Sequence, residues 1–378
     1  MENEDLDLSM PTTIDPAKIK KIAINTGGGD APGLNAVIRA ATLAARLRGW
    51  EVYGIRHGYR GLIDTNYLIQ LTKDRVRGIT HLGGTILGTA NKGDPFNYPI
   101  ETGKGIETID VSDKVVENFK RMGFDALITV GGDGSQRIAH KFAQKGIPVI
   151  GVPKTIDNDM FGTELTFGFD TAVTTATDAI DKLHSTAESH ERVMVVEVMG
   201  RYAGWIALHS GLAGSAHAIL IPEIPFDIEK ICQKIYSREA AGRHYSIVVC
   251  AEGAYPKDGA LITQNENIIG RPEPLLGGVA KYVAKEIAAR TGKETRSLVL
   301  GHLQRGGSPS SFDRLLGLRF GAAAVETLSE GKVNVMVALQ PPFIKTIPII
   351  DVINKSKNVP LECDTILAAR ELGVALGD

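Results

Sequence analysis

The stretch KIAINTGGGDAPGLNAVIRAATLAARLRGWEVYGI, residues 21–55, decides the fold class. Its first residues, 21–25, suit a buried strand, and three glycines follow them. Apolar residues then recur at helical spacing from Leu34 to Arg48, Gly49 ends that pattern, and a second apolar run occupies 50–55. Because a crossover helix joins strands that run in the same direction, this order predicts a pair of parallel strands.

The same order recurs along the chain. A further helical segment, Gln136–Gln144, ends at Gly146. Short, β-branched apolar runs that suit buried strands lie at 126–130, 147–152, 193–198, 246–251 and 297–302. The pattern predicts an α/β protein with two doubly wound domains, whose largely parallel sheets carry helices on both faces. Ligands of such sheets bind at the carboxyl ends of the strands, so the residues directly after each run are the candidates for chemistry.

Composition excludes several classes of protein. The chain has 378 residues, a hydrophobic content of 43% and a formal net charge of −2. With both signs mixed along the sequence, we expect neither a nucleic-acid-binding face nor a membrane-binding segment. The three cysteines lack metal-ligand spacing. Residues 1–18 are acidic and polar where a signal peptide would be basic and then apolar, so we expect a mobile N-terminal tail on a cytoplasmic enzyme.

Two strand ends are rich in glycine. NTGGGDAPG follows the first strand, and GGDGS, residues 131–135, follows the run at 126–130. Bare backbone can approach phosphate oxygens closely, Asp133 can hold a hard cation such as Mg²⁺, and Ser135 can cap the next helix. The alternatives are a tight turn and a helix cap made by Asp133. NAD binding is disfavoured, because the second strand continues into YGIRHGYRG without the acidic residue that would hold a ribose.

GVPKTIDNDM, residues 151–160, places charged side chains directly after an apolar run. In an extended segment Asp157 and Asp159 project to the same side, and their repulsion raises the proton affinity of one of them. One carboxylate can then accept a proton from a hydroxyl group, while Thr155 positions the reacting group and Lys154 attracts phosphate. An Asx-turn or a helix cap built by Asp157 and Asn158 is the structural alternative.

Further polar residues lie at the margins of later strands. A single arginine there is more often part of a surface ion pair, but several together indicate clamps on phosphate groups, because guanidinium binds phosphate oxygens in pairs. Glu252 and His302 can contact sugar hydroxyls and a sugar phosphate. The residues at these margins are Arg192, Arg201, Glu252, Arg296, His302 and Arg305.

The motifs GGDAPGLNAVIR, GGDGS, PKTIDND, VEVMGR, ETR and GHLQRGGSPSSFDR, in this order, resemble the phosphofructokinase family from about Ile22 to Arg314. The resemblance implies transfer of a phosphoryl group to the 1-hydroxyl of fructose 6-phosphate, with Mg²⁺ and with the active site in a cleft between two domains. It also implies a phosphate-donor domain, residues 19–155 with 303–350, and a fructose 6-phosphate domain, residues 156–302 with 351–378.

The resemblance also implies a role for each matched residue. Asp157 would be the base, with Thr155 and Asp159 beside it; Arg201 would stabilise the transferring phosphoryl group, and Asp133 would bind magnesium. Met199, Gly200, Glu252, His302 and Arg305 match sugar-site positions. Arg192 and Arg296 match residues that reach the active site of a neighbouring subunit, which implies a homo-oligomer, either a dimer or a tetramer.

The phosphate donor is ATP or pyrophosphate. Gly29, Gly134 and Ser135 match donor-site positions, and Gly134 with Lys154 combines a feature of ATP users with one of pyrophosphate users. An Asp at position 134 would put charge in the path of the α-phosphate, so its absence favours ATP. Asn91 stands where short bacterial forms have an arginine that bridges the phosphates, and Lys92 would replace its charge.

The resemblance also bears on regulation. Arg39, Glu223 and Arg243 match the regulatory pocket of the short bacterial forms, but Leu43, Asn66 and His184 replace basic residues there. We therefore expect weak or absent control by nucleoside diphosphate and phosphoenolpyruvate. Two other functions stay open: a kinase similar to NAD kinases that shares the GGDG turn, and a sugar-phosphate-binding subunit without catalysis. The intact PKTIDND and GHLQRGGSPSSFDR motifs disfavour the first, and the presence of Asp133, Asp157 and Arg201 disfavours the second.

Overall fold

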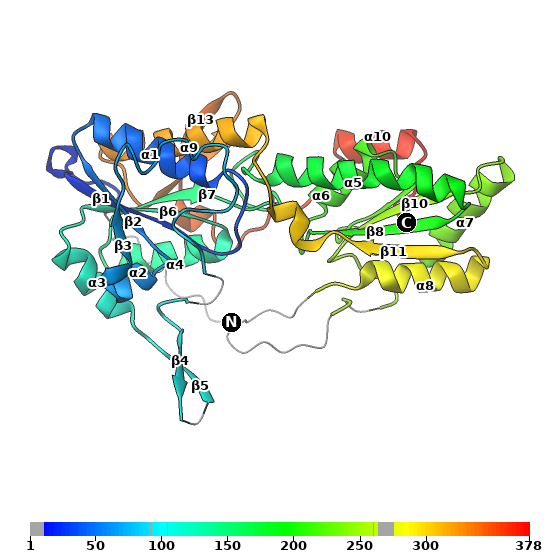
Figure 1. Ribbon diagram of the computed structural model, residues 1–378, viewed down its shortest axis with the longest axis horizontal. Coiled ribbons are helices and arrows are strands. Elements are labelled where there is room, and N and C mark those ends of the chain that lie inside the picture. Colours follow the sequence, from blue (N-terminus) through cyan, green and yellow to red (C-terminus); the bar gives the residue numbers. More distant parts are fainter. Residues whose placement is uncertain (1–10, 91–92, 104, 260, 264–275) are drawn as a thin grey trace. The chain divides into compact units, whose positions relative to one another are not determined.

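The computed structural model describes residues 11–90, 93–103, 105–259, 261–263 and 276–378, and the chain divides into two compact units (Figure 1). Unit 1 comprises residues 1–155, 160–168 and 307–355, and unit 2 comprises residues 156–159, 169–306 and 356–378. The boundaries differ from the predicted ones by short segments, because residues 160–168 and 351–355 fall in unit 1 and residues 303–306 in unit 2.

The sheet of unit 1 has the strand order β13-β12-β7-β6-β1-β2-β3. Its central strands run parallel, and β3 and β13 are antiparallel to their neighbours at the two edges. The strands are β1 (Lys21–Thr26), β2 (Glu51–Ile55), β3 (Leu68–Gln70), β6 (Ala126–Gly131), β7 (Val149–Pro153), β12 (Val335–Gln340) and β13 (Phe343–Pro348). Strands β6 and β7 are buried along their whole length, as expected for strands covered on both faces.

Helices cover both faces of this sheet (Figure 1). The helices are α1 (Leu34–Leu47), α2 (Arg60–Ile63), α3 (Ser112–Arg121), α4 (Asp133–Gln144) and α9 (Ser311–Ser329), with 3-10 turns η1 (Pro16–Lys18), η2 (Thr65–Tyr67) and η4 (Ile349–Asp351). Helices α1 and α9 pack closely, because a Cβ atom on Gly321 would lie 2.4 Å from the carbonyl oxygen of Val37. Gly49, with φ +80°, ends the first helix as predicted.

Unit 1 also has an exposed hairpin and a hydrogen-bonded N-terminal segment. A hairpin of β4 (Tyr98–Thr102) and β5 (Gly105–Ile109) follows the segment after β3, and every residue of β5 is exposed. Part of the segment predicted as a mobile tail is bonded to the unit: Ile14 N donates to Gly331 O at 2.7 Å, and Val333 N donates to Thr12 O at 3.0 Å. Residues 1–10 lie outside the described residues.

Unit 2 contains a sheet of parallel strands in the order β11-β8-β10-β9. The strands are β8 (Val193–Val198), β9 (Ala218–Leu220), β10 (Ser246–Ala251) and β11 (Thr295–Val299). Helices α5 and α6 lie on one face and α8 lies on the other (Figure 1). The elements of this unit are α5 (Phe169–Ser189), α6 (Trp205–Ala213), α7 (Ile228–Ala240), α8 (Val279–Thr291), α10 (Asp364–Glu371) and the 3-10 helix η3 (Gly301–Arg305).

The predicted α/β class with largely parallel sheets is confirmed, but the predicted end of one strand is wrong. The run at 297–302 is not a strand to its end, because β11 ends at Val299 and a 3-10 helix begins at Gly301. Gly301 has φ +49°, a left-handed conformation that ends an extended strand. None of the helices in the described part of the chain is long and apolar enough to cross a membrane.

Candidate active site

The glycine-rich stretches and Lys154 meet at one edge of the sheet in unit 1. Strands β7, β6 and β1 are neighbours in the sheet, and they are parallel and in register, with Gly131 opposite Pro153 and Val130 opposite Thr26. Their carboxyl ends are therefore adjacent. The sheet thus brings together the residues that follow these strands: Gly27, Gly28, Gly29, Gly132, Asp133, Gly134, Ser135 and Lys154.

Contacts within this cluster explain why its backbone needs glycine. A Cβ atom on Gly27 would lie 2.6 Å from Oγ of Ser135, and one on Gly131 would lie 2.3 Å from the same atom. Gly28 has φ +74°. The Lys154 Nζ atom donates a hydrogen bond to the carbonyl oxygen of Gly29, and Lys154 is 4% exposed. Lys154 therefore binds Gly29 directly, and Ser135 lies against Gly27 in the same glycine turn.

Helix α4 begins one turn earlier than the sequence suggests. Gly132 is its N-cap, and the side chains of Asp133 and Ser135 both lie in its first turn. The predicted capping role of Ser135 is therefore wrong, and the buried Ser135 packs against the glycines instead. Gly134 is exposed, and a Cβ atom there would meet nothing within 4 Å among the described residues. The amino end of this helix thus carries a positive partial charge and open space for an anion.

The carboxylate of Asp133 is suited to bind a cation whose other ligands are phosphate oxygens and water. Its carboxylate is paired with Arg137 and accepts a hydrogen bond from Asn354 N at 3.3 Å. Within the described ranges, no cluster of three or more His, Cys, Asp or Glu side chains could hold a metal by itself. A single carboxylate beside a phosphate-binding turn matches Mg²⁺, which keeps waters and phosphate oxygens as its other ligands.

Residues of the stretch GGTILGTA, 83–90, form hydrogen bonds with the glycine turn at residues 27–29 and with the end of β1. Gly28 N donates to Ala90 O at 3.3 Å, and the Thr89 hydroxyl donates to Gly28 O. The Thr26 hydroxyl donates to Gly88 O at 2.9 Å. Sequence reasoning assigned no role to Thr89, although its place two residues before Asn91 is a signal that could have identified it. Asn91 and Lys92, the predicted donor-site residues next to it, lie outside the described residues.

The predicted sugar-site residues of unit 2 gather at the carboxyl ends of β8 and β10. Glu252 N donates to Val198 O at 2.9 Å, and Gly253 N donates to Gly200 O at 3.0 Å. Gly200 has φ +137°, and a Cβ atom on Gly253 would lie 2.0 Å from Arg201 O. The loop that carries Arg201 is therefore pressed directly against the residues that follow Glu252.

Gln304 joins the 3-10 helix η3 to this loop, and sequence reasoning missed it. Its Oε1 accepts a hydrogen bond from Met199 N at 3.3 Å, and its Nε2 donates to Gly301 O at 3.1 Å. The side chain is fully buried. Since η3 carries His302 and Arg305, Gln304 attaches both predicted sugar-site residues to the end of β8. Its position inside the GHLQRGG motif is the signal that could have indicated this role.

Arg192 and Arg296 lie at the amino ends of their strands. This corrects the prediction that they stand at the carboxyl ends, where parallel strands place ligands. Arg192 directly precedes β8, and Arg296 is the second residue of β11. Met199 follows the far end of β8, a six-residue strand that spans about 20 Å. The two arginines therefore do not contribute to the cluster around Arg201 from the same end of the sheet.

The acidic pair belongs to unit 2, and its backbone is turned rather than extended. Asn158, between Asp157 and Asp159, has φ +53° and is buried. The premise that both carboxylates project to one side of an extended segment is therefore wrong. Asparagine tolerates this conformation better than most residues, so Asn158 itself was the signal of a turn. The carbonyl oxygen of Asp159 accepts a hydrogen bond from Lys357 N at 2.9 Å.

Glu223, a predicted remnant of a regulatory pocket, binds the backbone of its own unit. Its Oε1 accepts hydrogen bonds from Gly204 N at 3.0 Å and from Val359 N at 2.8 Å. Burial raises the pKa of this carboxyl group. Its acceptor oxygens are thus engaged by the loop after Arg201 and by the C-terminal part of the chain.

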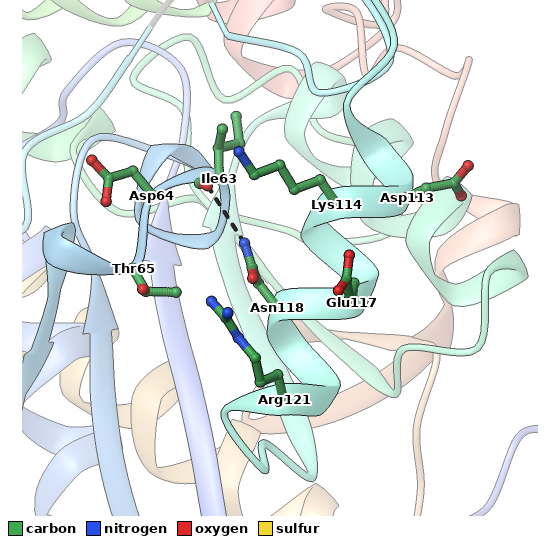
Figure 2. Close-up of a pocket in the computed structure, with 8 residues that line it drawn as sticks. All are labelled: Ile63, Asp64, Thr65, Asp113, Lys114, Glu117, Asn118 and Arg121. Carbon is green, nitrogen blue, oxygen red and sulfur yellow. Dashed lines mark hydrogen bonds between the residues drawn. The ribbon is translucent and has the colours of Figure 1, made fainter.

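Figure 2 shows a pocket of about 700 Å³ in unit 1, where α2 and η2 face α3. Asn118 in its wall donates to Leu62 O at 2.7 Å. The pocket is lined by Ile63, Asp64, Thr65, Asp113, Lys114, Glu117, Asn118 and Arg121. Acidic and basic side chains alternate there, and the lining contains no residue predicted for the reaction. We therefore assign the chemistry to the strand ends and not to this pocket.

Comparison with known proteins finds relatives along almost the whole chain. The family described as Phosphofructokinase matches residues 21–328. ATP-dependent 6-phosphofructokinase 2 of Clostridium perfringens is 50% identical over 364 residues, which are 95% of this chain and 99% of the relative. ATP-dependent 6-phosphofructokinase of Chloroflexus aggregans is 50% identical over 362 residues, 96% of this chain and 99% of the relative. Pyrophosphate–fructose 6-phosphate 1-phosphotransferase of Streptomyces coelicolor is 47% identical over 341 residues, 90% of this chain and 96% of the relative.

Solved structures share the fold. Pyrophosphate-dependent phosphofructokinase from Marinobacter aquaeolei matches with a TM-score of 0.76 and 25% identity, covering 95% of this chain and 88% of that one. Phosphofructokinase from Pichia pastoris matches with a TM-score of 0.75 and 31% identity, covering 94% of this chain and 37% of that one. The α/β architecture described above is therefore shared with both of these phosphofructokinases.

Proposed function

The chain belongs to the phosphofructokinase family, and we propose that it transfers the γ-phosphoryl group of ATP to the 1-hydroxyl of fructose 6-phosphate. The products are ADP and fructose 1,6-bisphosphate. The observation that carries this proposal is the 50% identity, over nearly the full length of both chains, to relatives named as ATP-dependent 6-phosphofructokinases. We place this glycolytic step in the cytoplasm.

The open space beside Gly134 supports ATP as the donor. With no atom of the described residues within 4 Å of a Cβ there, the amino end of α4 leaves room for an α-phosphate and the nucleoside beyond it. Pyrophosphate is the second candidate, since Lys154 places an ammonium group at the glycine turn and one relative at 47% identity is named as a pyrophosphate-dependent enzyme. Both donors use the same cluster in unit 1.

The residues of this chain would divide the reaction between them. Asp157 accepts the proton of the sugar's 1-hydroxyl while the oxygen of that hydroxyl attacks the γ-phosphorus of ATP. The bond between the γ-phosphorus and the oxygen that bridges it to ADP then breaks. Arg201 stabilises the charge on the transferring group, and Thr155 and Asp159 orient the reactants. Lys154 and Ser135 bind the donor phosphates. Because such transfer needs little covalent chemistry from the protein, alignment and charge neutralisation supply most of the rate.

Mg²⁺ fits this scheme at Asp133. When bound, the ion would neutralise charge on the donor phosphates. The Asp133 carboxylate would hold the ion, and its ion pair with Arg137 would then have to open. We propose that unit 1 is the phosphate-donor domain and unit 2 the fructose 6-phosphate domain.

Met199, Gly200, Glu252, His302 and Arg305 would bind the sugar at the carboxyl ends of β8, β10 and β11. Arg192 and Arg296 would bind the sugar 6-phosphate in a second copy of the chain. Their position at the amino ends of β8 and β11, away from the loop of Arg201 at the carboxyl end of β8 in the same chain, supports this assignment. A homo-oligomer, either a dimer or a tetramer, follows from it.

A parallel assay tests the proposed function. Purified protein is given fructose 6-phosphate and Mg²⁺ with either ATP or pyrophosphate, and fructose 1,6-bisphosphate is measured. We expect turnover with ATP to exceed turnover with pyrophosphate at equal donor concentration. Turnover with pyrophosphate alone would assign the second donor, and phosphorylation of NAD without phosphorylation of fructose 6-phosphate would overturn the proposal.

A further inference from the structure

A short segment near the C-terminus, residues 356–359, bonds to two separate parts of unit 2. Lys357 N donates to Asp159 O at 2.9 Å, which fixes the end of the acidic segment 156–159. Lys357 O in turn accepts a hydrogen bond from the indole Nε1 of Trp205 at 2.9 Å. One residue of the segment thus joins Asp159 to the first residue of α6 through its own backbone.

The carboxylate of Glu223 connects the same segment to the start of α6. Its Oε1 accepts from Val359 N at 2.8 Å and from Gly204 N at 3.0 Å. Val359 is 2% exposed, so water does not readily replace this bond. Gly204 is the N-cap of α6 and ends the loop that begins at Met199. Residues 356–359 are therefore bound to Trp205 directly and to Gly204 through Glu223, the two residues at which that loop passes into α6.

The loop between β8 and α6 has little freedom of its own. Gly200 is held at φ +137°, and a Cβ atom on it would lie 2.8 Å from Ala203 O. Gly253 packs against Arg201 O on the other side. A displacement of Gly204 would therefore move Arg201, which is three residues away, rather than be absorbed between them.

We propose that residues 356–359, with Trp205 and Glu223, form a positioning strap that keeps the acidic segment 156–159 and the loop of Arg201 in one fixed frame. The proposal rests on the proposed function, in which Asp157 and Arg201 act on the same transferring group. The strap touches neither substrate, and its members are positioning residues. A displacement of about 1 Å between reacting groups can lower a rate 100-fold, which is the reason for such a device.

Two variants test the strap. Trp205→Phe keeps an aromatic ring but removes the N–H that donates to Lys357 O, and Glu223→Met keeps an unbranched side chain of similar length but removes both oxygens that accept from Gly204 N and Val359 N. We expect kcat for fructose 6-phosphate phosphorylation to fall roughly 10- to 100-fold in each, with KM values for sugar and donor within about 3-fold of the parent. Tyr236→Phe is the matched control, because Tyr236 Oη donates to Arg290 O at the same distance of 2.9 Å on the exposed helix α7. We expect its kcat to stay at the parent value.

A second measurement does not depend on activity. Amide hydrogen exchange in peptides covering 156–160 and 199–204 should become faster in both strap variants and stay unchanged in the control. If the two segments exchange at the parent rate, or if kcat falls no further than in Tyr236→Phe, the strap is refuted. A parent protein that is inactive with both donors would overturn the proposed function instead, while the exchange result would still decide whether the strap exists.

Discussion

The Nε atom of Arg192 lies 2.9 Å from Oε2 of Glu294, and the other oxygen of that carboxylate lies 2.6 Å from Nη2 of Arg296. The pairing with Arg192 holds the pKa of Glu294 below its ordinary value. One carboxylate thus pairs with two guanidinium groups, one from the residue directly before β8 and one from the neighbouring strand β11. Because two cations share one anion, the group keeps a net positive charge, which suits a phosphate supplied by another molecule.

Replacing Arg296 by Leu tests whether this pair binds the sugar phosphate. We expect the KM for fructose 6-phosphate to rise roughly 10- to 100-fold with little change in kcat, because a hydrogen-bonded charge that serves binding in both ground and transition states is lost. Initial rates over a range of sugar concentrations measure this. The control is Lys293→Met, which breaks the nearby ion pair of Lys293 with Glu239 and should leave KM unchanged.

Analytical ultracentrifugation of the same variant separates binding from assembly. If Arg296→Leu stays in the parent's oligomeric state and keeps the parent's KM, the assignment of Arg192 and Arg296 to a neighbouring active site is wrong. A dissociated variant would instead make the arginine part of the interface.

Replacing Asp157 by Asn tests the proposed base. We expect kcat to fall about 10²- to 10⁴-fold, the usual contribution of a general base, while the KM for fructose 6-phosphate changes by a few-fold at most. Asp178→Asn, on the exposed side of α5 in the same unit, should retain parent activity. An Asp157 variant that turns over at the parent rate would remove this residue from the chemistry.

Local sequence identified most of the strands that are buried on both faces, although the short strand β9 and the mostly buried strand β12 were missed. The strands β1, β6, β7, β8 and β10 all begin within two residues of their predicted start, because a continuous apolar run is required where helices cover both sides. The antiparallel strand β13 was missed, since its residues alternate between partly buried and exposed and produce no such run. The turn at Gly301 also went unrecognised, because glycine alone does not reveal its φ angle.

The site was predictable as far as it follows strand ends, and less so where it depends on distant chain segments. Lys154, Gly29 and Ser135 meet as expected, because parallel neighbours end at the same edge. Which end of its strand an arginine occupies was not resolved, and Arg192 and Arg296 were placed at the wrong edge. The bond from Val359 to Glu223 joins residues 136 positions apart, and no local pattern indicates such a contact.

His217 makes the stability of the protein sensitive to acid. Burial, with the nearby charges of Arg238, His184 and Lys234 adding to it, lowers the pKa of His217 from 6.5 to about 3. Its Nδ1 accepts a hydrogen bond from Ile247 N at 2.8 Å, and the rings of His184 and Tyr245 pack around it. Between about pH 3 and pH 6.5 the unfolded chain therefore binds one more proton, at His217, than the folded protein does. The free energy of unfolding falls as the pH falls through this range.

Chemical denaturation at pH 7 and pH 5 checks this effect with the variant His217→Asn, whose amide oxygen can still accept from Ile247 N. We expect the parent to lose about 1–2 kcal/mol more than the variant between the two pH values, after allowance for partial access of water. His81→Asn, at an exposed position, should follow the parent. Equal losses in parent and His217→Asn would show that His217 is protonated without cost in the folded state.

Lys154 decides between the two phosphate donors in our account. Its ammonium group is buried, donates to Gly29 O and would lie 3.4 Å from a Cβ atom on Gly28, so it reaches the part of the turn where any donor's phosphates bind. Pyrophosphate is recognised through its phosphates alone, whereas ATP also offers a ribose and a base. Removing this charge should therefore weaken use of pyrophosphate more than use of ATP.

We expect Lys154→Met, which keeps an apolar stem in the buried site, to raise the ratio of kcat/KM for ATP to kcat/KM for pyrophosphate by about 10-fold or more. Lys154→Gly should change the ratio in the same direction, with an added loss of stability because it also removes the packed stem. Lys145→Met, which breaks the ion pair of Lys145 with Asp113 at the end of α4, is the control and should leave the ratio unchanged. If both Lys154 variants keep the parent's ratio, this side chain does not select the donor. The space beside Gly134 would then have to account for the preference, since it is the other feature at this turn that distinguishes a nucleotide from a bare diphosphate.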